Sequence, residues 1–348
     1  MSRDLKFFQA LNEATDVCMA KDPTVQIMGL GVPDPKGIFG STLGLVEKYG
    51  PERVSDLPTA ENGMTGVAIG AALAGMRPIM THVRLDFALL SLEQLVNQAA
   101  KWHYMFGGRM RVPLVVRMII GRGWGQGPQH SQSLQSWFAH VPGLKVMMPT
   151  TPHDAKGLLI SSVEDDNPVI FIEHRWLYNI SGPVPEGVYR VPIGKARVMR
   201  EGTDVTIVAI SYMALEALRA AEFLDAHGIS AEVIDLRSLR PWDEDAVFQS
   251  IRKTGRVVVT DTASKMAGFS GEVLARIAEE GLPLRVPPAR VCLPDSPTPT
   301  SPALAAHYYP RANDIAKTIE RMFGVTVAEI AEPPHPLDIP DPAFTGPF

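Results

Sequence analysis

An acidic residue followed by small residues is the first feature of this sequence that could do chemistry. Glu61, in DLPTAENGMTG, lies where a strand-like run ends and a helix-like run begins. The helix dipole favours a carboxylate in a first turn, so Glu61 is either an ordinary acid behind a Thr59 cap or an acid presented to a ligand. Gly63, Gly66 and Gly70 follow in an otherwise apolar segment. Glycines at this spacing would let another helix or a ligand approach closely.

A glycine-rich loop with a histidine at its end is the second feature. The run GRGWGQGPQHSQS (121–133) follows a strand-like segment and matches neither the dinucleotide fingerprint nor the Walker loop. His130 is either structural or functional, and a neutral imidazole there could exchange a proton near pH 7. Arg122, in the same loop, could bind a carboxylate or a phosphate through two hydrogen bonds.

Two further candidates have an ordinary alternative. Phe87, in RLDFALLSLEQ, is either a core residue or an aromatic that stacks on a planar ring. The segment SSVEDDNP (161–168) ends a helix with three acids, which the helix dipole disfavours. This segment is either a solvated turn or a cation site in which helix-end carbonyls and Asp165 supply the oxygens.

The composition limits what kind of protein this is. The chain has 348 residues, 45% of them apolar and 20% charged, and its net charge is −5. We therefore expect about two domains, and neither a nucleic acid nor a membrane as a partner, because both call for basic surface. Two cysteines and an N-terminus without a long apolar run predict a cytoplasmic protein.

The elements that must position these residues alternate between strand-like and helix-like runs. Strand-like segments at 24–32, 53–58, 77–83, 112–120, 144–149 and 168–173 are separated by helical segments, among them 61–75, 90–106 and 154–165. The pattern breaks between 176 and 202 and then resumes, with strands at 204–210, 230–236, 256–261 and 284–292 and helices across 212–227, 243–253 and 271–280. This alternation predicts an α/β fold of two doubly wound domains with mainly parallel sheets.

The domain boundaries follow from this pattern. We predict a first domain over 1–190, a second over 191–330 and a proline-rich tail over 331–348. Ligands of such sheets bind beyond the carboxyl ends of the strands. The candidate loops in the first domain therefore follow Leu57, Val83, Ile120 and Pro149.

Long segments of the chain resemble one known family. RVSDLPTAENGMTGVAIGAALAGMRPI, PQHSQSLQSWFAHVPGLKVMMPTTPHDAKGLL and GISAEVIDLRSLRPWD resemble the beta subunit of the thiamine-diphosphate-dependent pyruvate and branched-chain 2-oxo-acid dehydrogenases. The family belongs to the transketolase-like superfamily, and the resemblance covers roughly residues 5–325. It implies a pyrimidine-binding domain followed by a transketolase C-terminal domain.

The resemblance also implies roles for individual residues. Glu61 would bond the pyrimidine ring nitrogen of thiamine diphosphate and Phe87 would pack on that ring, with Leu57 beside them. His130 would lie near the substrate carboxylate and the lipoyl group. Arg122 makes its loop more basic than the resemblance leads us to expect, and it is a candidate substrate ligand by its own chemistry. The potassium site of some members would correspond to backbone carbonyls of Leu114 and Ser162 with Asp165 and Asn167. Magnesium would be held mainly by an alpha-type partner, because this chain has no GDG motif.

The expected function is therefore that of one half of an enzyme. The chain would decarboxylate a 2-oxo acid and transfer the acyl group to lipoyl-lysine, as part of an alpha2beta2 assembly that works with a lipoyl acyltransferase. It departs from the family at Leu30, where most beta subunits carry an acid. This departure keeps open an alternative, in which the chain is the pyrimidine-binding subunit of a split transketolase-like carboligase. A non-catalytic scaffold is disfavoured because Glu61, Phe87 and His130 are all present.

Overall fold

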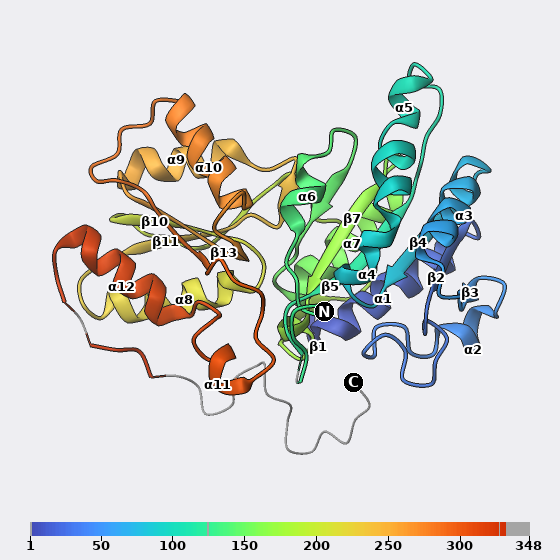
Figure 1. The fold of residues 1–348 in the computed structure, drawn as a ribbon, viewed down its shortest axis with the longest axis horizontal. Helices are drawn as coiled ribbons and strands as arrows, with labels where there is room; N and C mark the ends of the chain where they lie inside the picture. Colours follow the sequence, from blue (N-terminus) through green and yellow to red (C-terminus); the bar gives the residue numbers. More distant parts are fainter. Residues whose placement is uncertain (1, 124, 327, 332–348) are drawn as a thin grey trace. The chain divides into compact units, whose positions relative to one another are not determined.

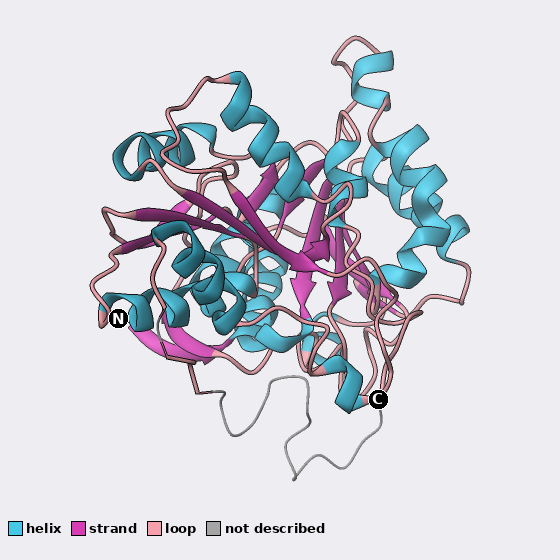
Figure 2. Cartoon of the chain, turned by 60° about the vertical axis from the view of Figure 1, so that its left-hand side comes forward, coloured by secondary structure: helices cyan, strands magenta, loops and turns pink. Residues whose placement is uncertain are grey.

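The computed structural model describes residues 2–123, 125–326 and 328–331. The chain forms two compact units, and each contains segments that are distant in sequence. Within the described residues, unit 1 comprises 2–120, 137–193 and 238–241, and unit 2 comprises 121–136, 194–237 and 242–331. The predicted tail begins at Ala331, and its residues 332–348 lie outside the described part. In each unit the strands lie between layers of helices (Figure 2).

The sheet of unit 1 has seven strands in the order β12-β6-β7-β5-β4-β2-β3. All neighbours pair in parallel except β12, which runs antiparallel to β6. The strands are β2 (Val25–Gly29), β3 (Val54–Ser55), β4 (Arg77–His82), β5 (Val115–Ile120), β6 (Lys145–Met147), β7 (Val169–His174) and β12 (Ser238–Arg240). Every residue of β5 and β7 is buried, as expected for strands covered on both faces.

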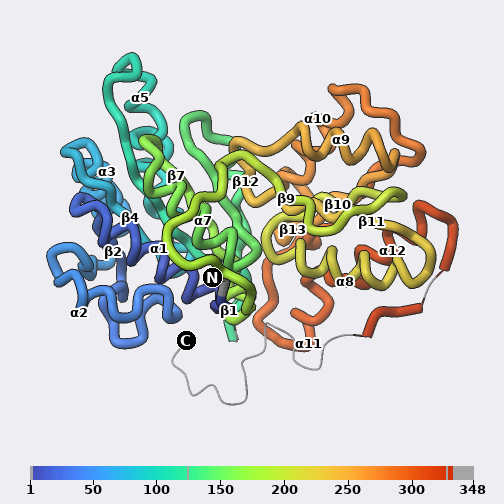
Figure 3. Tube along the Cα trace, turned by 180° about the vertical axis from the view of Figure 1, so that it is seen from behind, coloured from blue at the N-terminus to red at the C-terminus, as the bar shows by residue number. Residues whose placement is uncertain are grey.

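The helices of unit 1 include long elements and several short ones. Helices α1 (Phe7–Lys21) and α7 (Pro152–Glu164) pack against each other, and Figure 3 shows them side by side. Helix α3 (Glu61–Leu73) packs against β4. The shorter elements are α2 (Leu45–Tyr49), α4 (Leu85–Ala88), η1 (Leu89–Ser91), η2 (Gln94–Ala99), α5 (Trp102–Met105) and η3 (Arg175–Leu177). Helix α6 (Gln135–His140) has its first two residues in unit 2 and the rest in unit 1.

Unit 2 contains a five-stranded sheet in the order β14-β13-β10-β11-β9. Its strands are β9 (Arg197–Arg200), β10 (Val205–Ala209), β11 (Ala231–Asp235), β13 (Val257–Ser264) and β14 (Ala289–Leu293), and only the β9–β11 pair is antiparallel. Helices α9 (Glu244–Thr254) and α10 (Phe269–Glu279) cover one face, and α8 (Met213–Asp225) and α12 (Ala312–Phe323) cover the other (Figure 1). A short helix, α11 (Pro302–Ala305), precedes α12.

The predicted fold class is confirmed, whereas three local predictions are wrong. The helix expected over 90–106 is divided into η1, the π-helix η2 and α5, because apolar spacing does not reveal a change of helical pitch. The last strand begins at Ala289 rather than at 284, since Pro287 and Pro288 donate no backbone hydrogen bond. The connection after Trp176 contains β8 (Ser181–Pro185), which pairs antiparallel with β1 (Ser2–Lys6).

No helix in the described part of the chain is long and apolar enough to cross a membrane.

Candidate active site

Glu61 is the first residue of α3, and its helix begins without a side-chain cap. The N-cap is Ala60, which has no side chain able to bond the first-turn N–H groups, so the expected Thr59 cap is wrong. The helix nevertheless starts at Glu61 because the Ala60 carbonyl accepts a hydrogen bond from Met64 N–H at 2.9 Å. Glu61 is half-buried, and its backbone carbonyl accepts a bond from Ser91 Oγ at 3.0 Å. The acid is therefore held at the positive end of the helix dipole.

A cavity of about 210 Å³ lies beside Glu61 and brings three predicted site residues together. We call it the Glu61 pocket, and it is formed by α3, the end of β4, the start of α4 and the loops before them. Leu57 and Phe87 line it together with Glu61, and so does Leu30, the position that departs from the family. Its remaining lining residues are Pro58, Thr59, Met64, Met80, Thr81, His82 and Val83. An acid at the edge of an apolar wall suits a planar ring that carries a polar edge.

The chain leading into this pocket depends on a close backbone approach. A Cβ atom on Gly29 would lie 2.3 Å from the carbonyl oxygen of Thr81, so β2 and β4 approach this closely only with glycine at that position. Beyond it, Gly31 N–H donates to Asp56 Oδ1 at 2.9 Å, and Leu57 N–H donates to the same oxygen at 2.9 Å. Asp56 therefore ties the loop that carries Leu30 to the loop that carries Leu57.

His82 is a pocket residue that the sequence analysis did not single out. It ends β4, and only 5% of its surface is exposed. Burial lowers the pKa of its imidazole to about 4, so the ring is neutral at physiological pH. The sequence did contain a signal for His82. It lies at the carboxyl end of a strand, directly before Val83, and a candidate ligand loop follows Val83.

His130 lies on a loop that belongs to unit 2. The loop comprises residues 121–136, and we call it the His130 loop; its Trp124 lies outside the described residues. His130 is half-buried, and its N–H donates to the Gly127 carbonyl at 3.2 Å. The predicted substrate ligand Arg122 is buried, and its guanidinium donates to the Thr300 carbonyl at 2.6 Å. Its contact with a substrate therefore stays a prediction.

Two further contacts hold the His130 loop against unit 2. A Cβ atom on Gly127 would lie 2.0 Å from Thr300 Oγ1, so the backbone packs directly on that side chain. Gln135 Nε2 donates at 2.7 Å to Oδ1 of Asp261, which is fully buried on β13. Burial raises the pKa of Asp261 to about 7, although the hydrogen bond from Gln135 acts against the shift. These contacts were not predicted, because they join residues more than 120 positions apart.

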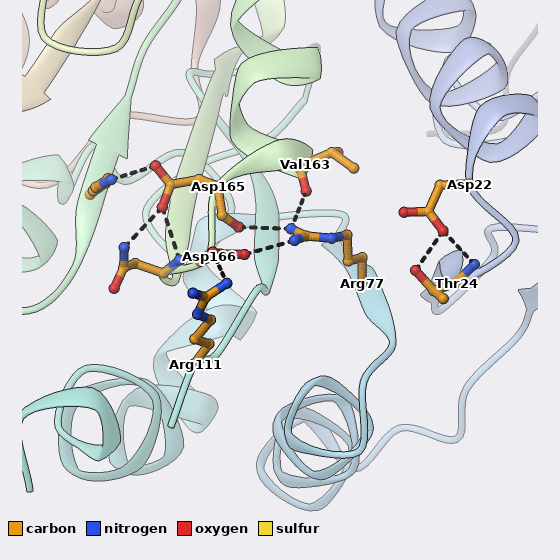
Figure 4. Close-up of polar contacts among 9 residues, drawn as sticks. Asp22, Thr24, Arg77, Arg111, Val163, Asp165 and Asp166 are labelled. Atoms are coloured by element: carbon orange, nitrogen blue, oxygen red, sulfur yellow. Dashed lines mark hydrogen bonds and ion pairs between the residues drawn. The ribbon is translucent and has the colours of Figure 1, made fainter. Parts of the chain in front are cut away.

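Charged side chains surround Asp165, one residue of the predicted potassium site (Figure 4). Asp165 accepts bonds from Asn167 N–H at 2.9 Å and from Asn167 Nδ2 at 3.1 Å, and its other oxygen pairs with the ammonium of Lys145. The carbonyls of Leu114 and Ser162 accept bonds from Val169 N–H at 2.8 Å and Asp165 N–H at 3.3 Å.

Arg77 and Arg111 complete this charged cluster. Arg77 donates to the carbonyls of Val163 at 3.0 Å and Asp165 at 3.1 Å and to Asp166 Oδ1 at 2.7 Å, while Arg111 donates to Asp166 Oδ2 at 2.6 Å (Figure 4). The aspartates already face cations of the chain itself, so these residues fit an added cation poorly. Potassium binding stays a prediction, and no step of the proposed chemistry depends on it.

Comparison with known proteins identifies the class of protein that this fold and pocket define. The family model "Transketolase, pyrimidine binding domain" matches residues 3–181, and "Transketolase, C-terminal domain" matches residues 194–315. The chain therefore belongs to the transketolase-like family in which these two domains follow each other. The His130 loop falls within the pyrimidine-binding match, although it packs in the second compact unit.

Full-length relatives place the chain more narrowly within this family. It is 44% identical to the beta subunit of acetoin:2,6-dichlorophenolindophenol oxidoreductase from Cupriavidus necator, over 91% of this chain and 96% of the relative. The corresponding Bacillus subtilis subunit is 40% identical, over 96% and 99% of the two chains. Pyruvate dehydrogenase E1 component subunit beta-1, mitochondrial, from Arabidopsis thaliana is 42% identical, over 92% and 90%.

A solved structure supports the fold independently. The structure titled "Split gene transketolase, inactive beta4 tetramer" aligns with a TM-score of 0.76 and covers 92% of this chain and 99% of its own. The two sequences are 24% identical, so the likeness establishes the shared fold and nothing further. The resemblance to the beta-subunit family noted from the sequence is confirmed by the full-length relatives.

Proposed function

We propose that this chain is the pyrimidine-binding, beta-type subunit of a thiamine-diphosphate-dependent dehydrogenase. The observation that carries the proposal is the Glu61 pocket, which gathers Glu61, Leu57 and Phe87. The pocket occurs in a chain 40–44% identical to beta subunits of acetoin:2,6-dichlorophenolindophenol oxidoreductase and of the pyruvate dehydrogenase E1 component. Fold alone would not assign this chemistry, because transketolase-like domains serve several reactions.

The pocket suits half of thiamine diphosphate rather than the whole molecule. Its volume of about 210 Å³ is below the roughly 300–1,000 Å³ of sites that hold drug-sized ligands. One aminopyrimidine ring matches this space, with Phe87 against its face and Glu61 at its nitrogen edge. In the described part of the chain, no cluster of three or more His, Cys, Asp or Glu side chains could hold a metal. We therefore assign the diphosphate and its magnesium to an alpha-type partner.

The roles of the chain's own residues follow from their chemistry. Thiamine diphosphate supplies, when bound, a thiazolium carbon that acts as a nucleophile toward a carbonyl group. The Glu61 carboxylate holds a proton at a nitrogen of the pyrimidine ring, and the apolar wall of Leu57 and Phe87 strengthens that bond by excluding water. His130 binds the substrate and relays a proton to the acceptor, because a histidine is suited to proton transfer near neutral pH.

The surface of α3 supports the proposed partner. Gly63, Val67 and Gly70 form an exposed stripe along the helix, and a Cβ atom on Gly63 or Gly70 would meet nothing within 4 Å. A helix face this flat allows the backbone of another chain to approach closely. We propose an alpha2beta2 assembly in which this face is covered. The cytoplasmic location also stays a proposal, because some of the relatives are mitochondrial proteins.

Two classes of substrate fit the proposed function. The sequence-based proposal is a 2-oxo acid, which is decarboxylated before the acyl group passes to lipoyl-lysine on a lipoyl acyltransferase. The names of two relatives favour acetoin, a hydroxyketone, as a second candidate. Leu30 lines the Glu61 pocket and keeps that part of its wall apolar, where the resemblance led us to expect an acid. The split carboligase is a third outcome, in which a sugar-like aldehyde is the acceptor.

Reconstitution with the alpha-type partner tests the function. We expect the purified chain alone to be inactive and to bind thiamine diphosphate weakly. The reconstituted pair should reduce 2,6-dichlorophenolindophenol with one substrate from a panel of 2-oxo acids and acetoin. Turnover by this chain without a partner, or no cofactor binding by the pair, would contradict the proposal. Reaction with sugar-like aldehydes instead of lipoyl domain would favour the carboligase.

A His130→Ala variant tests the acceptor half of the reaction. We expect the variant pair to bind thiamine diphosphate and to keep most of its dye reduction, because Glu61 is intact. Acylation of the lipoyl domain should fall by roughly 10²–10⁴-fold, the usual contribution of a general acid–base group. His140→Ala on α6 is a matched control that should affect neither assay. Equal losses in the two assays would contradict the role given to His130.

A further inference from the structure

Two polar side chains that line the Glu61 pocket lack hydrogen-bond partners. They are Thr81 and His82, at the end of β4, and 2% and 5% of their surfaces are exposed. Among the residues that the structure describes, neither Thr81 Oγ1 nor His82 Nε2 has a hydrogen-bond partner. Thr59 and Glu61 are the other polar residues of the lining, and Glu61 comes from a different element, α3. Polar groups from a strand and a helix therefore line one small cavity.

An unpartnered imidazole in a core is a cost that a purely structural residue would avoid. A buried donor or acceptor that has lost water and gained no partner destabilises the fold, and native proteins contain few such groups. An apolar residue of similar shape would fill the same space without this cost. Met80, two residues earlier on β4, is an apolar residue of this kind on the pocket wall. The position of His82 therefore indicates a bond that forms only when the pocket is filled.

The imidazole is also in the protonation state that such a bond requires. Its pKa is lowered by burial, so at neutral pH one ring nitrogen carries a proton and the other can accept one. A neutral ring can meet an amino group or a ring nitrogen of a heterocycle without bringing a second charge near Glu61. A protonated ring could donate from both nitrogens but could no longer accept a bond from an amino group.

We propose that His82, assisted by Thr81, is a binding residue of the Glu61 pocket and bonds the polar edge of the planar heterocycle that enters it. The inference rests on the proposed function, in which that heterocycle is the aminopyrimidine ring of thiamine diphosphate. Glu61 then holds one ring nitrogen, and Nε2 of His82 contacts a second polar atom of the ring. The pair of contacts distinguishes an aminopyrimidine from an aromatic ring with a single nitrogen.

A His82→Phe substitution separates this role from a structural one, because the two roles predict opposite signs. Phenylalanine has nearly the same shape and no polar atom, so the melting temperature of the free chain should rise. The affinity of the reconstituted pair for thiamine diphosphate, measured by calorimetry, should fall by about three- to tenfold, the equivalent of one neutral hydrogen bond. A fall in the melting temperature, or a variant too unstable to purify, would show that the imidazole is structural and would overturn the proposal.

Two companion variants and one analogue sharpen the test. His82→Gln places an amide near the position of Nε2 and should recover most of the affinity, whereas Ile79→Val, at a buried position of β4 that does not line the pocket, should leave the affinity unchanged. A thiamine diphosphate analogue that lacks the pyrimidine amino group should bind the wild-type pair and His82→Phe equally if His82 contacts that group.

The outcomes distinguish this inference from the proposed function. If the wild-type pair does not bind thiamine diphosphate, the proposed function fails. If it binds and His82→Phe binds equally well, only the role of His82 is overturned. If the affinity difference between the wild-type pair and His82→Phe is as large with the analogue as with thiamine diphosphate, His82 contacts a ring nitrogen rather than the amino group. This outcome also supports the proposal.

Discussion

A buried titratable group lies in the Glu61 pocket and another lies beneath the His130 loop. The two groups differ in their hydrogen bonds and in the direction of their pKa shifts. Among the described residues, Nε2 of His82 in the pocket has no partner, whereas Asp261 beneath the loop accepts a bond from Gln135 through Oδ1 at 2.7 Å and only its Oδ2 has no partner. Burial lowers the pKa of the first to about 4 and raises that of the second to about 7. Both shifts favour the neutral form. The difference fits the proposal that His82 bonds a ligand of the pocket, while the bond from Gln135 to Asp261 holds the His130 loop in place.

The largest expected effect tests the pocket side of this comparison. Glu61→Gln keeps the size of the side chain but cannot hold a ring-nitrogen proton as a carboxylate does. Turnover of the reconstituted pair should fall by roughly 10²–10⁴-fold, with an unchanged melting temperature. Glu52→Gln, at an exposed glutamate of the same unit, is the matched control. If the variant keeps more than about a tenth of wild-type activity, by the same scale of general acid–base contributions, Glu61 is not the activating acid.

A smaller expected loss of activity tests how the His130 loop is positioned. In Gly127→Ala the new methyl group would meet Thr300 Oγ1 at 2.0 Å, so either Thr300 or the His130 loop must shift, and we expect the loop to move. Lipoyl acylation should fall on the order of 10- to 100-fold, as is usual when a reacting group is displaced by about 1 Å. Amide hydrogen exchange across 125–136 should increase in the same variant.

A second-site substitution provides the control for this displacement. Thr300→Ala removes Oγ1 and leaves the backbone carbonyl that Arg122 contacts. Alone it should be nearly neutral, and combined with Gly127→Ala it should restore part of the acylation and the exchange protection. The absence of any recovery in the double variant would show that this contact does not position the loop.

The smallest expected effect concerns the pH dependence of stability. Folded Asp261 keeps a proton that the unfolded chain releases near pH 4, so its contribution to stability is lost as the pH rises from about 4 to about 7. Asp261→Asn cannot ionise and still offers an oxygen to Gln135. It should therefore melt about 3–5 °C above wild type at pH 8 and close to wild type at pH 5.

For His82 the expected dependence of folding stability on pH has the opposite sign. Its folded pKa of about 4 lies below its ordinary value of 6.5, so its contribution is lost as the pH falls from about 6.5 to about 4. His82→Phe should therefore flatten the acid side of the stability profile, as Asp261→Asn flattens the other side. Parallel melting curves from pH 4 to pH 8 measure both, and a shared sign would contradict the comparison.

Much of the fold could be predicted from local sequence patterns, and the misses have physical causes. The parallel strands were found because buried strands such as β5 and β7 are continuous apolar runs. The β1–β8 pair was missed because its strands have little burial to mark them and lie far apart in sequence. The division of the helix over 90–106 was missed because a π-helical segment keeps its apolar face.

In the candidate site too, the features of short segments could be predicted from the sequence, whereas contacts between distant segments could not. The sequence by itself determined that Glu61 begins a helix, that Phe87 follows a strand and that His130 ends a glycine-rich loop, because composition and periodicity are local properties. Only the tertiary structure placed Leu57, Phe87 and His82 around Glu61 in one cavity, and only it bonded Gln135 to Asp261. Such contacts are set by the packing of strands and helices that are distant in sequence, and so is the burial that shifts the pKa values of His82 and Asp261.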